Sequence, residues 1–213
     1  MGASDVRLAN EMLDDVIRRR RSCRAFGDEV PPQEVATHVL EAGMHAPYAA
    51  LAVGGRPDFR RFFVFSRGGE ALSRLRTIAG RHQQQMLARF EEEATRNPVL
   101  AAQLPVLRPR LGGGVIPVCP WFVVVAELNG YPPVANEALA HCLQNMWLKA
   151  TALGLGMQLV SLVEATAADE ELAGLLGLKV GEYSLAGCAL GYPAQPLGPS
   201  ERPDTAAATT WLG

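Results

Sequence analysis

Short apolar runs alternate with stretches of helical periodicity along this chain, and this alternation restricts the fold more than any other feature. Strands are expected at 61–65, 121–126, 157–163 and 183–190. Helices are expected at 5–20, 31–47, 70–104, 135–153 and 167–176. Residues 105–120 contain four prolines and three consecutive glycines, which predicts a loop. Because elements of both kinds are interleaved, the sequence predicts a mixed α/β or α+β architecture.

The composition fits one globular domain spanning residues 1–213. Hydrophobic residues make up 48% of the chain and charged residues 20%, which is enough for a packed core. A net charge of −2 argues against nucleic acid or a membrane surface as a partner. No apolar run reaches the roughly 18 residues of a membrane span. The N-terminus is unlike a signal peptide, and the four cysteines are scattered without a CxxC pair, so we expect a cytoplasmic protein.

The most conspicuous candidate site is a basic run with five arginines in the seven residues 18–24. Guanidinium groups bind phosphate in two-point geometry, and the hydroxyl of Ser22 would add a donor. The same residues could instead be the solvated end of a helix, where positive charge is favourable. A nuclear-localisation or nucleic-acid patch is a third reading, which the acidic remainder of the chain weakens. The residues alone leave these readings open.

Other candidate motifs carry little chemistry. The glycines at 112–114 lack the Lys-Ser/Thr of a phosphate-binding P-loop, so a mobile loop is the better interpretation. Glu137 and His141 have a chelating spacing, but no third ligand accompanies them, and we expect no metal site. No GxSxG motif is present, and no acid–base or nucleophilic catalytic residue is predicted.

Three blocks of the sequence, in order, resemble the flavin-dependent nitroreductase family. The first is RRSCRAF at 20–26, followed by Val30-Pro31 and the Ala46-Pro47 step. The second is NEALAHCLQNMWLKATALGLG at 136–156. The third is Leu190-Gly191-Tyr192-Pro193 with a downstream arginine. Each block is weak alone, but three in order over most of the chain are fairly specific.

The resemblance implies an α+β fold: a three-layer α/β/α sandwich with a mostly antiparallel central sheet. It also implies an intertwined homodimer with tightly but non-covalently bound FMN at the subunit interface. The residue range 70–118 would cover the pocket, and 192–213 would form an extended tail on the partner. The implied cofactor-binding residues are Arg20, Arg21, Ser22, Arg24, Ser161, Leu162 and Arg202. Arg20, Arg21, Ser22 and Arg202 would hold the phosphate and ribityl chain, Arg24 would approach the N1/O2 edge of the flavin, and Leu159 to Leu162 would face N5.

The sequence departs from the family after Pro47. Members usually continue with an Asn and a Gln that reach the flavin ring, whereas residues 48–56 here contain no amide side chain. Because buried polar edges rarely go unsatisfied, we expect backbone N–H groups of this stretch, with Gly54 and Gly55, to serve the ring. A side chain such as Gln158 or Asn145 at the pyrimidine edge would contradict that expectation.

The resemblance implies an FMN-dependent oxidoreductase of small molecules. NADH or NADPH would give a hydride to the flavin, and an electron-poor acceptor such as a quinone or nitro compound would then receive it. Two alternatives stay open: a flavin-dependent oxidase or dehydrogenase of a specialised metabolite, and a flavin-binding module with little turnover. The plainest alternative is an α+β domain whose arginines only cap a helix.

Overall fold

The computed structural model describes residues 2–112, 114–198 and 202–212. Its α-helices are α1 (Ala3–Arg19), α2 (Gln33–Met44), α3 (Glu70–Ala94), α4 (Pro98–Gly112), α5 (Ala135–Ala152) and α6 (Glu170–Leu176). Its strands are β1 (Arg60–Ser66), β2 (Trp121–Leu128), β3 (Gly156–Val160) and β4 (Tyr183–Gly191). Two short 3-10 helices are η1 (Ser161–Thr166) and η2 (Ala206–Ala208). None of the described helices is long and apolar enough to cross a membrane.

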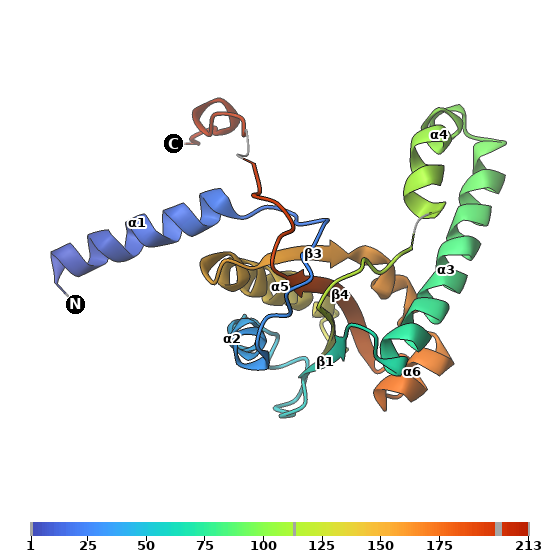
Figure 1. The fold of residues 1–213 in the computed structure, drawn as a ribbon, viewed down its shortest axis with the longest axis horizontal. Coiled ribbons are helices and arrows are strands. Elements are labelled where there is room, and N and C mark those ends of the chain that lie inside the picture. Colours follow the sequence, from blue (N-terminus) through green and yellow to red (C-terminus); the bar gives the residue numbers. More distant parts are fainter. Residues whose placement is uncertain (1, 113, 199–201, 213) are drawn as a thin grey trace.

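The strands form one sheet in the order β1-β2-β4-β3, and every pair of neighbours is antiparallel (Figure 1). Strand β2 is central and buried on both faces. Val123 and Val125 pack with α2 and α5 on one face, and Phe122 and Val124 pack with α3 and α6 on the other. These two apolar clusters make three layers, helix, sheet and helix, so the expected α+β architecture with an antiparallel sheet is confirmed.

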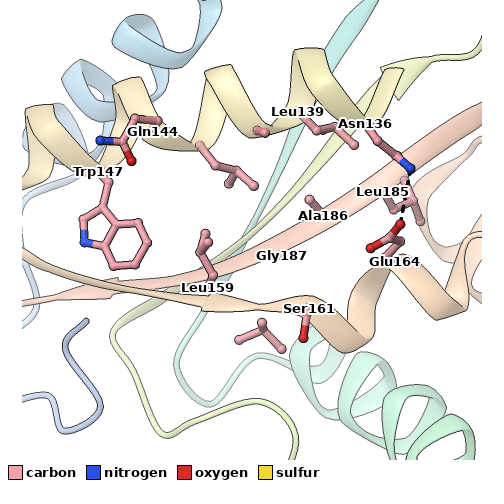
Figure 2. Close-up of a pocket in the computed structure, with 13 residues that line it drawn as sticks. Asn136, Leu139, Gln144, Trp147, Leu159, Ser161, Glu164, Leu185, Ala186 and Gly187 are labelled. Atoms are coloured by element: carbon pink, nitrogen blue, oxygen red, sulfur yellow. Dashed lines mark hydrogen bonds between the residues drawn. The ribbon is translucent and has the colours of Figure 1, made fainter. Parts of the chain in front are cut away.

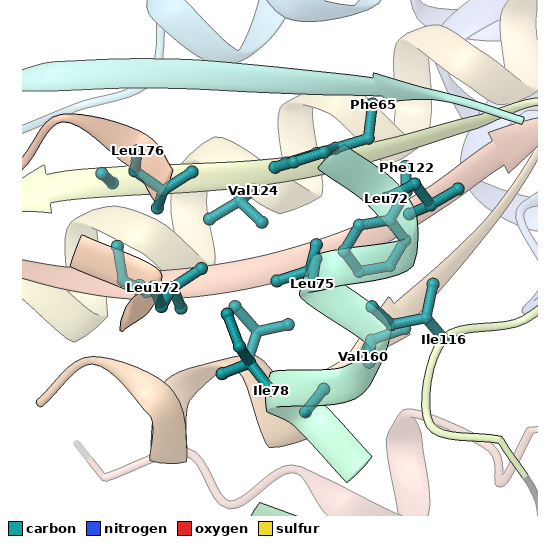
Figure 3. Packing of buried hydrophobic residues seen from close by; sticks show 14 of the residues in the cluster. Phe65, Leu72, Leu75, Ile78, Ile116, Phe122, Val124, Val160, Leu172 and Leu176 are labelled. Carbon is teal, nitrogen blue, oxygen red and sulfur yellow. The ribbon is translucent and has the colours of Figure 1, made fainter. Parts of the chain in front are cut away.

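The packing on the α3 side explains why this helix is held on the sheet. Leu72, Leu75 and Ile78 recur at helical spacing along α3 and are almost fully buried. Figure 3 shows them against Phe65 and Phe122 of the sheet. Beyond this buried stretch, α3 continues away from the sheet and returns through α4, so the two helices form a projecting hairpin (Figure 1).

The predicted loop at 105–120 was wrong in its first half, because α4 runs through Pro105 and Pro109. A proline removes one helical hydrogen bond but does not forbid a helix that is anchored at its ends and sides. The Asn97 side chain caps α4 by accepting bonds from two backbone N–H groups of its first turn. Arg108 pairs with Glu91 of α3 at 2.6 Å and ties α4 to the neighbouring helix. Gly113, the middle glycine of the triglycine, lies outside the described residues.

Two element boundaries also differ from the prediction. The strand expected at 157–163 ends at Val160 and gives way to η1, whose Val163 is buried against the α3 side of the core. The helix expected from residue 167 begins at Glu170, because the Asp169 carboxylate accepts a 2.9 Å bond from the Leu172 N–H and sets the N-cap.

Helix α1 is the least covered element of the fold. It extends away from the three layers on one side (Figure 1). Its apolar residues keep about half or more of their surface exposed; they are Val6, Leu8, Met12, Leu13 and Ile17. The chain's own packing therefore leaves the apolar stripe of α1 without a buried partner.

Candidate functional site

The chain segment after α1 lies as an added strand between β3 and the C-terminal tail. Ser22 forms a parallel bridge with Met157, and the Cys23 N–H donates to the Met157 carbonyl at 3.0 Å. On the other side, the Ala194 N–H donates to the Ala25 carbonyl at 3.0 Å. We call residues 18–27 the arginine segment. Backbone hydrogen bonds on both sides hold the backbone of residues 22–27 in place, and this sets where the side chains begin.

A glycine makes this close approach possible. A Cβ at Gly156 would lie 2.5 Å from both Cβ and Sγ of Cys23, which is closer than real side chains pack. Cys23 is fully buried there, and burial raises the pKa of its thiol. The buried Cys23 thiol therefore packs against the backbone of β3 as a neutral group.

A surface cavity of about 860 Å³ lies beside the arginine segment. Three arginines predicted to bind phosphate line it together: Arg20, Arg21 and, from the tail, Arg202. No carboxylate lines the cavity among the described residues. Burial lowers the pKa of Arg20, and the positive charges of Arg202 and Arg21 lower it further. Arg19, which also lines the cavity, pairs with Asp15 at 2.7 Å, so the cavity's positive charge comes mainly from Arg20, Arg21 and Arg202.

Aromatic and backbone contacts hold two of these arginines in place. The Arg20 guanidinium lies over the Trp147 ring at 4.5 Å from its centroid, a cation–π arrangement. The Trp147 indole N–H in turn donates to the Arg21 carbonyl at 3.0 Å. Arg21 donates to the carbonyls of Arg18 and Gly198 at 2.7 and 3.0 Å, so it fastens the tail to the end of α1.

Trp147 also lines an apolar slot of about 270 Å³ between α5 and the β3 edge of the sheet. Figure 2 shows Trp147 on α5 and Leu159 on β3 across this slot. At the far end, the Asn136 amide donates to Glu164 at 3.3 Å. Arg20 lines the arginine cavity and lies over the ring of Trp147, which lines the slot, so this stacked pair connects the linings of the two spaces.

The other predicted residues are distributed around these spaces. Ser22 lies on the bridge to β3, next to the cavity-lining arginines. Ser161 lines the slot and also a third cavity of about 580 Å³, between α3 and the β3–η1 junction, which Leu162 lines as well. Arg24 is exposed and lines none of these three cavities. The structure thus gathers Arg20, Arg21 and Arg202 on one cavity, and places Ser161 and Leu162 in η1, directly after the edge strand β3.

The third cavity contains residues that are not among the predicted cofactor-binding residues, although Gln158 was named as a competing contact to the flavin ring. Gln83 and Met86 of the predicted pocket-covering range line it, together with Gln158 and Glu164. The Oε1 atom of Gln158 is buried and has no hydrogen-bond partner in the described part of the chain. A glutamine inside an apolar strand could have been noticed in the sequence, but its isolation depends on packing that no sequence pattern reveals.

The stretch at 48–56 folds as a tight loop in which four of the nine backbone N–H groups bond within the loop. Four of these groups donate to carbonyls of the same stretch; they belong to Ala50, Val53, Gly54 and Arg56. Tyr48 stacks on Phe59 with ring centroids 3.9 Å apart, and Arg56 pairs with Glu182 at 2.9 Å. The loop lines none of the three cavities described above. Those four N–H groups are therefore engaged within the loop, but Gly55 is not among them, so the expectation that this stretch serves the flavin ring stays a prediction.

The family model described as the nitroreductase family matches residues 17–192, more than four fifths of the chain. The chain belongs to the nitroreductase family. This match covers the arginine segment, the sheet and α5, but ends before Arg202. No curated protein matches the chain.

Solved structures agree with the family on the fold. A nitroreductase with bound FMN from Desulfitobacterium hafniense DCB-2 is 22% identical, with a TM-score of 0.67 over 95% of this chain and 98% of that chain. A nitroreductase with bound FMN from Bacteroides fragilis NCTC 9343 is 22% identical, with a TM-score of 0.66 over 94% and 98%. An iodotyrosine deiodinase bound to FMN and 3-iodo-L-tyrosine is 18% identical, with a TM-score of 0.64 over 90% and 95%. One fold thus carries different activities.

Proposed function

We propose that this protein is an FMN-dependent oxidoreductase that transfers a hydride from NADH or NADPH to an electron-poor acceptor, such as a quinone or nitro compound. The observation that carries the proposal is the convergence of Arg20, Arg21 and Arg202 on one cavity beside the β3 edge. Family membership and the FMN in neighbouring structures supply the identity of the anion.

The residues present fit a flavin mononucleotide. The cavity has unneutralised guanidinium groups and no carboxylate among its described lining residues, which suits a phosphate dianion. Arg20 and Arg202 would hold the phosphate, and Ser22 would add a hydroxyl. Arg21 would act mainly by fixing the tail, since its guanidinium already bonds to carbonyls. The ring would then extend along β3 toward Ser161 and Leu162.

Bound FMN would supply the hydride and electron chemistry of the reaction. The protein's own residues would bind and orient the ring, and the apolar lining of the slot would exclude water. Arg24 is exposed and follows the residues that pair with β3. It would bring a positive charge to the pyrimidine edge of the flavin ring. No residue of the chain is required to act as an acid or base.

The test is a titration of FMN into the cofactor-free protein. Losing one charge-assisted contact costs about 1.5–3 kcal/mol, so Arg20→Ala should weaken FMN binding roughly 10- to 150-fold. Arg96→Ala is the matched control, because Arg96 is exposed and pairs only with Glu92 on α3. Equal affinity of wild type and Arg20→Ala would contradict the assignment of the phosphate site.

A second candidate function is a flavin-binding module with little turnover. The loop at 48–56 favours it, because this loop has no amide side chain and bonds many of its own N–H groups. A steady-state assay with NADH and NADPH against several acceptors separates the two. An oxidoreductase turns over with at least one pair, whereas a binding module takes up FMN and shows negligible turnover.

We also propose that the protein is a homodimer, with α1 and the tail lying on the partner. The exposed apolar stripe of α1 supports this, as do Trp211 and Leu212, which keep over nine tenths of their surface exposed. A second copy of the chain would bury both. Light scattering that shows a monomer at micromolar concentration with FMN bound would contradict this proposal.

A further inference from the structure

The cavity between α3 and the β3–η1 junction contains a buried polar atom without a partner. Strand alternation places Gln158 on the same face of the sheet as Val160, which packs in the α3-side core. Its Oε1 atom is buried and accepts no hydrogen bond from the described residues. Leaving a buried acceptor unpaired is costly, and such groups in native proteins call for an explanation.

The rest of the lining defines what could pair with that atom. Met86, Val115 and Leu162 give apolar and adaptable walls. Glu164 is the one ionisable residue among the described lining residues, so the cavity carries a negative charge and no positive one. A carboxylate or phosphate ligand would be repelled by this charge. A neutral planar molecule that donates hydrogen bonds would match both the walls and the acceptor.

The cavity of Gln158 meets the apolar slot at the sheet edge, since Val160, Ser161 and Glu164 line both spaces. Gln158 follows Met157, whose carbonyl receives the Cys23 N–H, and lies on β3 three positions before Ser161, the first residue of η1. The loop at 48–56, where the family places its ring-contacting amides, lines no part of this cavity. Of the amides near β3, Asn145 is already engaged, since its Nδ2 donates to the Ala42 carbonyl at 3.2 Å.

We propose that Gln158 is a ligand-binding residue, and that its Oε1 accepts a hydrogen bond from an N–H or O–H group of a neutral planar molecule in this cavity. The donor is either the imide N–H of the flavin ring or a hydroxyl or amine of the acceptor substrate. In both cases Gln158 supplies a side-chain contact that residues 48–56 cannot make. This inference rests on the proposed flavin function.

The first test uses Gln158→Leu, with Gln158→Met as a second variant if the leucine protein fails to fold. In the cofactor-free state either change removes an unpaired buried acceptor, so the thermal midpoint should stay unchanged or rise. A purely structural glutamine would give the opposite result, a lower midpoint with unchanged ligand affinity. Gln84→Leu, at an exposed position on α3, is the matched control.

The flavin arm compares FMN with N3-methyl-FMN, which lacks the imide N–H. If the flavin is the donor, wild type should prefer FMN by about tenfold, and Gln158→Leu should bind both equally. The substrate arm compares the KM of a hydroxyl-bearing naphthoquinone with that of its methyl ether. If the acceptor is the donor, wild type should discriminate between these two by a similar factor, and the variant should not.

Loss of discrimination in either arm supports the proposal and identifies the donor. The proposal is overturned if Gln158→Leu or Gln158→Met keeps the wild-type ratio in both arms, or if wild type discriminates in neither. Failure of the wider function looks different: a protein that binds no FMN, or binds it independently of Arg20, contradicts the oxidoreductase proposal. A protein whose FMN binding depends on Arg20 but not on Gln158 contradicts only this inference.

Discussion

The arginine segment and the 48–56 loop are both regions where the family contacts its flavin, yet they are built in opposite ways. The arginine segment lines a cavity with several positive charges. Burial lowers the pKa of Arg20 most, and the neighbouring positive charges lower it further. In the loop, by contrast, backbone N–H groups bond to carbonyls of the same stretch, and the Arg56 guanidinium pairs with Asp58 at 2.6 Å. Charged groups without a partner in the chain are available to bind a ligand, whereas polar groups that already bond within the chain stabilise a turn.

The two regions also lie at opposite ends of β4. Tyr183 at its start donates to the Asp58 carbonyl at 3.2 Å, while a Cβ on Gly191 at its end would lie 3.1 Å from Phe26. The nine residues of β4 span roughly 27 Å at about 3.3 Å per residue. Within one chain, therefore, the arginine segment and the loop are far apart.

The largest expected effect comes from filling a glycine in each region. Gly156→Ala places a methyl group against buried Cys23, and overpacking of this kind should cost about 3 kcal/mol of unfolding free energy. FMN affinity should fall with it, because the arginine segment is displaced. Gly54→Ala meets no neighbouring atom but has a φ of 59°, so it should cost only about 1 kcal/mol and leave FMN binding unchanged.

Urea unfolding and FMN titration of the two variants measure this difference. If Gly54→Ala weakened FMN binding as much as Gly156→Ala does, the loop would be part of the cofactor site and the contrast between the two regions would fail.

A smaller effect is expected from the exposed stripe of α1, which leads into the arginine segment. Leu13 is 52% exposed in the isolated chain. Leu13→Asp should raise the dimer dissociation constant by at least about tenfold, because a charge would be buried at the interface. Asp14→Ala, on the same helix, is the control. Sedimentation of both variants at several concentrations tests this, and an unchanged dimer in Leu13→Asp would remove α1 from the interface.

The smallest effect concerns the ion pair that anchors the loop. The hydrogen bonds from Arg56 hold the pKa of Asp58 well below its usual value. A carboxyl with a depressed folded-state pKa stabilises the protein above its unfolded pKa, and this contribution is lost as the pH falls below about 4. Because the pair is exposed, the change should be slight.

Urea midpoints at pH 6 and pH 3 of wild type and Asp58→Asn measure this contribution. Wild type should lose slightly more stability on acidification than the variant does. An identical loss in both would show that Asp58 does not anchor the loop.

Local patterns were sufficient to predict most of the architecture. The periodicity of Ala135 to Leu153 gave α5, and the apolar runs gave β1, β2 and β4 almost residue for residue. The arginine-rich run identified the segment that lines the 860 Å³ cavity, and the downstream Arg202 lines it too. These features could be predicted because each depends on residue types at short spacing or on a family motif.

What the sequence missed depends on contacts between distant parts of the chain. Helix α4 survives two internal prolines because Asn97 caps it and Arg108 pairs with α3. Strand β3 stops at Val160 because η1 turns its next apolar residues into the core. The isolation of Gln158 arises only once α3 and the chain after α4 enclose a cavity with β3. Each outcome is decided by tertiary packing, which overrides local propensity.

The central claim is that the arginine segment holds a phosphate. The most direct measurement compares the affinities of FMN and riboflavin, which differ only in that group, for the cofactor-free protein. We expect FMN to bind at least about 100-fold more tightly, with most of that preference lost in Arg20→Ala. Equal binding of the two flavins by the wild-type protein would contradict the account.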